Sequence, residues 1–388
     1  MIKNELEKNY IIELLKCSIT NTTPSTPDES LDWDVVFQCG KVHRILPVLY
    51  FSIQKLPDEY KRKIDKIKHY ELAYKSNLID DANRENEISI ITKELFKYNI
   101  DFILLKGTVT KHFYPDTSMR MMNDVDILYR NKTAKDIKNL FEDLGYTQTK
   151  STPKDAMYLS PNQLVKVEMQ QSLLDDGFTD WLKYIDTIWD RCEKKSENEY
   201  TMTSEDFYIY HIVHMAKHFI NGGVGLRHVL DTWVIKNHFT ELNQNYVEKV
   251  LTELSLITFN QQISSLCNYW FDDYSPSNKE DINLLSEFIF ANGAFGNIGQ
   301  QSVNESAAGK KRKVFPDRKT MANYYGDVIN KHPSTIPLYW IKLNFTRAFI
   351  NNKKTQTKIK SMSNISYNQK EKTKQLFEIC GLTSQGRF

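Results

Sequence analysis

Two aspartates separated by one residue, Asp124 and Asp126, lie in the segment DVDILYR (124–130), which has the pattern of a β-strand. Side chains two residues apart point to the same side of a strand, so these carboxylates would lie about 7 Å apart while Val125 and Ile127 face the core. Mg²⁺ prefers oxygen ligands from one or two carboxylates and keeps positions for substrate phosphates. The pattern therefore predicts a divalent-cation site, although an ordinary strand with acidic residues on one side also explains it.

A second feature lies upstream, where the apolar run DFILL (101–105) is followed by Lys106, Gly107 and Thr108. A strand that ends at glycine and leads into a helical segment offers free backbone amides to an anion, and glycine lets the backbone approach closely. This arrangement predicts a phosphate-binding step. The alternative is a turn that precedes an ordinary strand.

A third carboxylate, Glu168, lies in the later strand-like segment QLVKVEMQQSL (163–173), between Val167 and Met169. A charged residue among core-facing neighbours needs a partner, and a metal ion would supply one. We interpret Glu168 as a metal ligand or general base; the alternative is the exposed face of a half-solvated edge strand. A phosphate-binding step and three carboxylates are the parts needed to move a nucleotidyl group from a nucleoside triphosphate.

Three histidines, His211, His214 and His218, follow one another at spacings that place them on one face of a helix. They predict an interdomain contact with internal hydrogen bonds, a contact with the nucleotide or acceptor, or a zinc site without an established fourth ligand. Arg227 and Asp231 are four residues apart. They predict an ion pair within one helix, which would contribute about 0.3–0.5 kcal/mol if exposed, or a pair that braces the site.

The segments that must position these residues divide the chain into three parts. Apolar residues at helical spacing predict an N-terminal helical region over 1–100, and strand-like runs predict a core over 101–200. Helical spacing resumes over 201–388, interrupted by a basic loop (304–319). Its KKRK run predicts a solvated loop, with a nucleic-acid patch or a cover that attracts anions as alternatives. The expected fold class is α+β, with a small mixed sheet embedded between helical regions.

Composition limits the class of protein. The chain has 388 residues with 40% apolar residues, which indicates a folded globular protein, and its formal charge of +2 gives no strong nucleic-acid signal. Five cysteines without a CxxC pair predict free thiols in a reducing compartment. The charged N-terminus is no secretory signal, and no apolar run approaches the roughly 20 residues of a membrane span. We expect a soluble cytoplasmic protein with no membrane partner.

The segment FILLKG…YPDTSMRMMNDVDILY (102–129) resembles a pattern of a largely uncharacterised bacterial nucleotidyltransferase family within the polymerase β-like superfamily. Upstream, Trp33, His43 and Pro47 occur in matching places. Downstream, YHIVHMAKH and GLRHVLDTWV resemble the helical segment of the family, and residues 315–347 resemble its closing element. The resemblance therefore covers most of the chain in the right order.

The resemblance implies a Mg²⁺-dependent transfer of a nucleotide. It assigns roles to residues already named: Lys106, Gly107 and Thr108 at the phosphates, with Asp124 and Asp126 as metal ligands. It also makes Arg120 a candidate for a triphosphate or structural contact. The later acidic strand of the family typically reads DLHW where this chain has VEMQ, so Glu168 would replace an aspartate and Gln170 a histidine.

We therefore expect a nucleotidyltransferase that transfers NMP from an NTP to an unidentified hydroxyl acceptor, with release of pyrophosphate. The acceptor is a sugar, a metabolite, a protein or RNA. The VEMQ strand motivates one alternative, a catalytically degenerate module that binds nucleotide or acts as a scaffold. A toxin-like enzyme that nucleotidylates a protein or tRNA is a further alternative.

Overall fold

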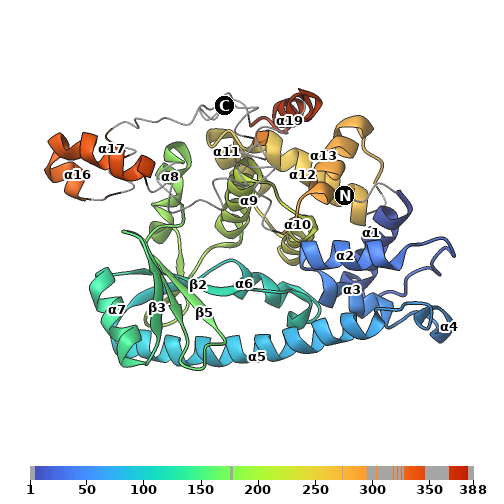
Figure 1. The fold of residues 1–388 in the computed structure, drawn as a ribbon, viewed down its shortest axis with the longest axis horizontal. Coiled ribbons are helices and arrows are strands. Elements are labelled where there is room, and N and C mark those ends of the chain that lie inside the picture. The colour runs from blue at the N-terminus through green and yellow to red at the C-terminus, as the bar shows by residue number, and fades with distance from the viewer. Residues whose placement is uncertain are drawn as a thin grey trace.

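A computed structural model describes residues 5–174, 178–272, 274–294, 303–304, 318, 321, 325, 327–345 and 367–382. Helices precede and follow a seven-stranded mixed sheet, which confirms the expected α+β class (Figure 1). Most of the predicted basic loop 304–319, including its KKRK run, lies outside the described residues.

The N-terminal region is helical, as predicted: α1 (Glu5–Ile19), α2 (Trp33–His43), α3 (Leu46–Ile53), α4 (Asp58–Lys61) and α5 (Ile67–Lys97). Asp32 caps α2 by accepting hydrogen bonds from the amides of Asp34 and Val35. Pro47 lies in the first turn of α3, where a missing N–H leaves no helical hydrogen bond unmade. The 31-residue helix α5 runs beneath the sheet along one side of the molecule (Figure 1).

One sheet contains all described strands in the order β3-β4-β5-β2-β1-β7-β6. Their bounds are β1 (Asp101–Leu104), β2 (Asp124–Arg130), β3 (Thr147–Ser151), β4 (Asp155–Leu159), β5 (Lys166–Gln170), β6 (Glu193–Lys194) and β7 (Glu199–Thr201). The three predicted strands are confirmed as β1, β2 and β5. Because β5 lies between β2 and β4, the alternative that places Glu168 on an edge strand is wrong.

The strands β3, β4, β6 and β7 were not predicted. β3 reads TQTKS and is polar along its length, and β6 and β7 contain only two and three residues. Segments this short or this polar lack the period-2 alternation of apolar residues that marks a strand. Their backbone is extended because neighbouring strands offer hydrogen-bond partners, which the local sequence does not reveal.

The apolar side of the sheet packs against α5 and α7 (Ala134–Asp143). Val125 and Ile127 of β2 belong to this buried cluster together with Ile91 of α5 and Phe141 of α7. Because side chains alternate along a strand, the residues between and beside them on β2 point to the opposite side of the sheet. Packing on α5 and α7 therefore turns the acidic side of β2 toward the C-terminal helices.

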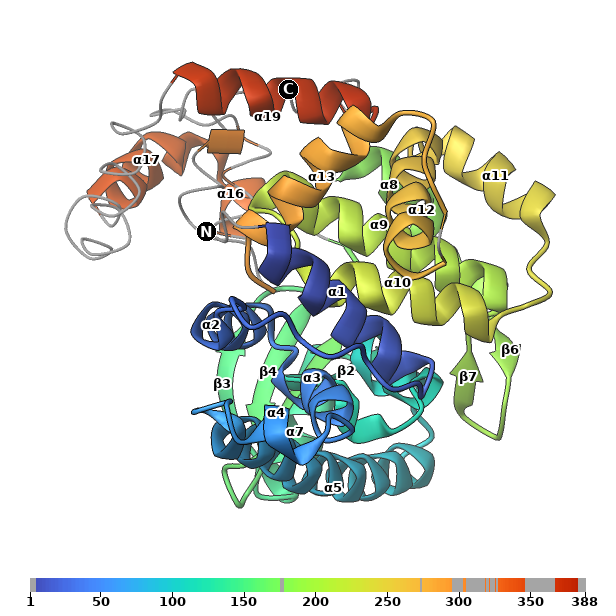
Figure 2. The ribbon, with the colours of Figure 1, turned by 90° about the vertical axis from the view of Figure 1, so that its right-hand side faces the viewer.

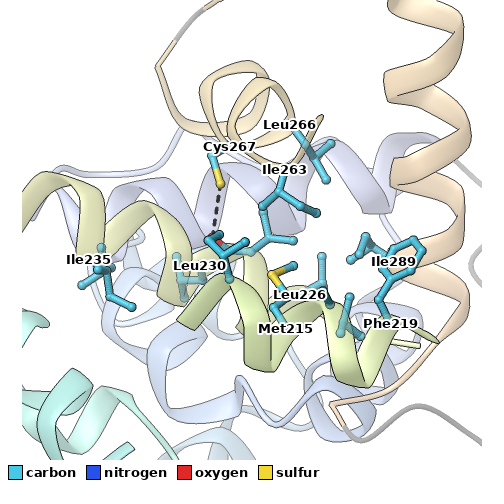
Figure 3. Close-up of a cluster of buried hydrophobic side chains, with 14 of the residues drawn as sticks. Met215, Phe219, Leu226, Leu230, Ile235, Ile263, Leu266, Cys267 and Ile289 are labelled. Atoms are coloured by element: carbon cyan, nitrogen blue, oxygen red, sulfur yellow. Dashed lines mark hydrogen bonds between the residues drawn. The ribbon is translucent and has the colours of Figure 1, made fainter. Parts of the chain in front are cut away.

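The C-terminal region is helical, as predicted: α8 (Thr179–Ile185), α9 (Ser204–Asn221), α10 (Leu226–His238), α11 (Gln244–Glu253), α12 (Ile257–Phe271), α13 (Lys279–Ala291), α16 (Asp327–Lys331), α17 (Ile336–Phe345) and α19 (Tyr367–Ile379). Thr203 caps α9 by accepting a hydrogen bond from the amide of Asp206. Figure 3 shows the apolar contact of α9, α10, α12 and α13, where the Cys267 thiol donates to the Val229 carbonyl oxygen (3.4 Å).

The two helical regions share one apolar core. Leu14 of α1 and Leu49 of α3 belong to the same buried cluster as Phe219 of α9, and α1 packs beside α12 (Figure 2). The buried His43 at the end of α2 accepts a hydrogen bond from the amide of Leu226, the first residue of α10 (3.1 Å). The three-part division at 1–100, 101–200 and 201–388 stays a prediction.

All five cysteines are free thiols, as predicted, and four of them are buried. Within the described ranges, no helix is both long enough and apolar enough to cross a membrane.

The segment between β1 and β2 contains α6 (Gly107–Thr110) and the short 3-10 helices η1 (Lys111–Phe113) and η2 (Thr117–Met119). The fully buried Lys111 ammonium fastens this segment to α5, since it lies 2.5 Å from Asp81 Oδ1 and 2.5 Å from Glu85 Oε1. The Thr117 hydroxyl donates to the other oxygen of Asp81 (2.7 Å). Helix α5 thus holds the segment that leads to the acidic strand β2.

Replacement of this buried cation should be strongly destabilising. Lys111→Met leaves the buried Asp81 carboxylate without its cation, so the free energy of unfolding should fall by about 3–5 kcal/mol in a urea titration. Lys75→Met, which removes an exposed ion pair with Glu71 on the same helix, is the matched control and should change stability little. Equal stability of the two variants would contradict the anchoring role of Lys111.

Candidate active site

A cavity of about 720 Å³ lies between the acidic side of the sheet and helices α9 and α10. Both walls are polar. The sheet side contributes Lys106, Gly107, Arg120, Asp124, Asp126, Glu168 and Gln170. The helix side contributes Tyr210, His211, His214, Lys217, His218, Arg227, His228 and Asp231. The fold therefore brings the predicted site residues to one cavity, with the exception of Thr108.

The three predicted carboxylates lie on two adjacent strands. Asp126 of β2 is directly opposite Glu168 of β5 in the parallel register, and Asp124 lies two residues before Asp126 on the same side. The Gln170 side-chain amide donates to Asp126 Oδ1 (2.7 Å) and to Glu168 Oε2 (3.0 Å). Gln170 therefore fixes the orientation of the Asp126 and Glu168 side chains.

Burial and neighbouring negative charge raise the proton affinity of Asp124 and Glu168. Burial, followed by the charge of Asp126, raises the pKa of Asp124 against the opposing effect of Lys106. Burial raises the pKa of Glu168 to about 7; Lys106 opposes this rise, and Asp126 and Asp124 add to it. The site thus concentrates negative charge on oxygen ligands, which is the donor set that Mg²⁺ prefers.

The side chain of Lys106 lies among these carboxylates, with Nζ 2.7 Å from Asp126 Oδ1. Burial alone would lower the pKa of Lys106, but the combined effects of Asp126, Tyr210 and Glu168 outweigh it and the pKa is raised. As the side chains stand, no group of three or more His, Cys, Asp or Glu residues in the described ranges is arranged to hold a metal ion. At the carboxylates, Lys106 supplies the positive charge.

The backbone of Lys106 is strained, with φ 47° and ψ −123°, a combination that residues other than glycine rarely adopt. The next residue is Gly107, and a side chain is excluded there because a Cβ would overlap Nη1 of Arg120. Thr108 is buried and does not line the cavity, and within the described part of the chain its hydroxyl has no hydrogen-bond partner. Of the predicted phosphate-binding step, Lys106 and Gly107 face the cavity, and the glycine makes room for an arginine.

Arg120 forms a bidentate ion pair with Asp231 of α10. Its Nε and Nη2 lie 2.8 and 2.9 Å from the two carboxylate oxygens, and Tyr114 donates to the same carboxylate (2.7 Å). Burial would raise the pKa of Asp231, but the charge and hydrogen bonds of Arg120, together with the charge of Arg227, outweigh it and lower the pKa to about 2. Arg120 therefore makes the structural contact, one of its two predicted roles.

In place of the predicted ion pair within α10 between Arg227 and Asp231, the buried Asp231 carboxylate pairs with Arg120 from another part of the chain. Arg227 Nη1 donates to the Met121 carbonyl oxygen (3.1 Å). The predicted bracing role fits better, because both residues join α10 to the segment before β2.

The three predicted histidines do share one face of α9 and line the cavity. His211 Nε2 lies 2.8 Å from the Thr232 hydroxyl, and the Nε2 atoms of His214 and His218 lie 3.2 Å apart. Burial lowers the pKa of His211 to about 4 and that of His214 well below its usual value, so both rings are neutral at pH 7. The internal hydrogen bonds match the first of the predicted readings.

Sequence reasoning missed three residues of the helix wall: Tyr210, Lys217 and His228. Tyr210 lies one helical turn before His214, with ring centroids 6.0 Å apart, and lines the cavity. His228 lies on α10, with its ring centroid 5.9 Å from that of His218. The spacing of Tyr210 and His214 on α9 would have revealed the tyrosine, whereas the approach of His228 required the packing of two helices.

The raised pKa of Glu168 predicts a pH-dependent effect on stability. The unfolded-state pKa is about 4.3, so the contribution of Glu168 is present below that pH and is lost as pH rises through about 7. Glu168→Gln stays neutral, and it should raise the unfolding temperature of the metal-free protein at pH 8 but change it little at pH 5. Thermal scans in EDTA measure this. Glu253→Gln, at an exposed position of α11, should show no such pH dependence.

Removal of the Asp231 charge tests the buried ion pair. Asp231→Asn leaves the Arg120 guanidinium buried without its counter-charge, so the free energy of unfolding should fall by about 3–5 kcal/mol. Asp58→Asn, which removes the exposed pair with Lys61, is the control and should be close to wild type in the same urea titration. A wild-type-like Asp231→Asn would show that the pair does not hold α10 in place.

Comparison with known proteins places the chain in a family. A family described as uncharacterised nucleotidyltransferase matches residues 29–272, more than half of the chain. The matched range extends from α2 to α12 and contains the whole sheet and every residue that lines the cavity. No curated protein and no solved structure matches the chain. The chain belongs to this uncharacterised nucleotidyltransferase family.

Proposed function

We propose that the protein transfers NMP from a nucleoside triphosphate to a hydroxyl acceptor in a Mg²⁺-dependent reaction that releases pyrophosphate. The observation that carries the proposal is the convergence of Asp124, Asp126 and Glu168 from two paired strands on a cavity that Lys106 also lines. Membership of a nucleotidyltransferase family supports the general reaction class. A cavity of about 720 Å³ is within the range of small-molecule sites.

The three carboxyl groups supply oxygen donors of the kind that a hard divalent cation prefers, and burial together with neighbouring negative charge raises the pKa of Asp124 and Glu168. Asp124, Asp126 and Glu168 would hold Mg²⁺, which when bound neutralises charge on the phosphates. Lys106 would turn its ammonium from Asp126 to a phosphate oxygen, a change that requires only rotation of a flexible side chain. Gln170 keeps Asp126 and Glu168 oriented during this exchange.

As the alternative to its role as third metal ligand, Glu168 is the proposed general base. With a pKa of about 7 in the free site, its ionised form accepts the proton of the acceptor hydroxyl. The hydroxyl oxygen then forms a bond to the α-phosphorus, and the bond from that phosphorus to the bridging oxygen breaks, so pyrophosphate leaves. The neutral histidines of α9 line the opposite wall, where they offer hydrogen bonds to an acceptor without adding charge.

A second candidate function is binding of a nucleotide without turnover. The observation that favours it is the occupation of Asp126 Oδ1 by both Lys106 and Gln170, which leaves that oxygen less able to bind a metal ion. Calorimetric titration with Mg²⁺ and each NTP, combined with a pyrophosphate-release assay in the presence of cell extract as acceptor source, separates the two. Binding without release would favour the second function.

Loss of either β2 carboxylate should abolish transfer. Asp124→Asn and Asp126→Asn are expected to reduce pyrophosphate release at least 100-fold, because each removes a proposed ligand while it preserves shape. Asp143→Asn, at an exposed position of α7, is the matched control and should retain full activity. Circular dichroism checks that all three variants are folded. Normal transfer by the Asp124→Asn/Asp126→Asn double variant would refute the mechanism.

A further inference from the structure

Tyr210 of α9 carries a buried hydroxyl that has no hydrogen-bond partner among the residues that the structure describes. The residue is 2% exposed and lines the cavity. A buried hydroxyl without a partner is unfavourable, so most native structures avoid one. Within α9, the contrast with Tyr208 is direct, because the Tyr208 hydroxyl donates to Asn260 Oδ1 (2.6 Å) on α12.

The charged groups that act on the Tyr210 hydroxyl are those of the proposed reaction site: Lys106, Asp126 and Glu168. Burial is the largest effect and raises the pKa of Tyr210, so the phenol keeps its proton at neutral pH and remains a hydrogen-bond donor. The His214 ring packs one turn away, at 6.0 Å between centroids, and limits the positions of the tyrosine ring. Among the described residues, the Tyr210 hydroxyl is thus a donor without a protein acceptor. It lies in the same cavity as Asp124, Asp126 and Glu168, which form the carboxylate wall.

We propose that Tyr210 donates a hydrogen bond to a phosphate oxygen of the bound nucleoside triphosphate and so helps to hold the triphosphate against the carboxylate wall. The inference rests on the proposed function. A triphosphate supplies anionic oxygens, which are the strongest acceptors for such a donor, at the place where Lys106 and the three carboxylates converge. In the free protein the hydroxyl is unsatisfied, and the ligand satisfies it.

The isosteric substitution Tyr210→Phe tests this proposal with two readouts that move in opposite directions. Without ligand, the variant should unfold at the same or a higher temperature than wild type, since it loses a buried donor that has no partner. Its affinity for Mg²⁺ with NTP, and for Mg²⁺ with tripolyphosphate, should be about 10- to 100-fold weaker in calorimetric titrations. Binding of the nucleoside without phosphates should be unchanged.

Two tyrosines outside the cavity provide matched controls. Tyr208→Phe removes a satisfied hydroxyl and should lower the unfolding temperature without changing affinity for tripolyphosphate. Tyr70 is fully buried, and its hydroxyl also has no partner, but it does not line the cavity. Tyr70→Phe should therefore match Tyr210→Phe in its stability and match wild type in its affinity.

Three outcomes would overturn the proposal. The first is wild-type affinity of Tyr210→Phe for tripolyphosphate; if Asp124→Asn and Asp126→Asn still lose transfer, the proposed function stands and only the role of Tyr210 fails. The second is a loss of stability as large as that of Tyr208→Phe, which would show that the hydroxyl has a partner in the free protein. The third is a wild-type protein that binds no NTP, which overturns both the proposal and the proposed function.

Discussion

Arg120 and Asp231 meet in a buried, bidentate ion pair that joins the segment between β1 and β2 to helix α10. The pair sets the distance between the two walls of the cavity, because its partners belong to opposite walls. It also accounts for the glycine at position 107, since the guanidinium occupies the space of a side chain there. Neither charge tolerates burial alone, so the contact is formed as a whole or not at all.

The carboxylates of the sheet side of the cavity also depend on a nearby opposite charge. Strand register holds Asp124, Asp126 and Glu168 close together. Their repulsion is relieved partly by proton binding at Glu168 and partly by the ammonium group of Lys106. The strained backbone at Lys106 delivers this ammonium to Asp126. Strain at such a position persists only where the surroundings enforce it, and here β1, β2 and the Arg120 contact do so. In the free site, Lys106 therefore balances part of the negative charge of the carboxylates. A divalent cation and an anionic ligand that bind together can take over this role.

The helix wall has a different character. Burial keeps His211 and His214 neutral, and Tyr210 retains its proton, so this wall presents neutral hydrogen-bonding groups beside its charged residues Lys217, Arg227 and Asp231. Its position follows from the shared apolar core, in which α1 and α3 pack with α9 and α12. The N-terminal helices thus contribute to the cavity indirectly, because His43 caps the start of α10, the helix that carries Asp231.

The sequence by itself determined the α+β class, the strands β1, β2 and β5, and the carboxylates on them, because alternation along a strand is a local property. It also indicated the histidine face of α9 through helical spacing. Tertiary structure decided the rest. The partner of Asp231 is Arg120 rather than the nearby Arg227, Thr108 turns into the core, and β5 lies inside the sheet. These outcomes depend on contacts between residues far apart in the chain, where burial selects the partner of each charge, and no local pattern encodes that choice.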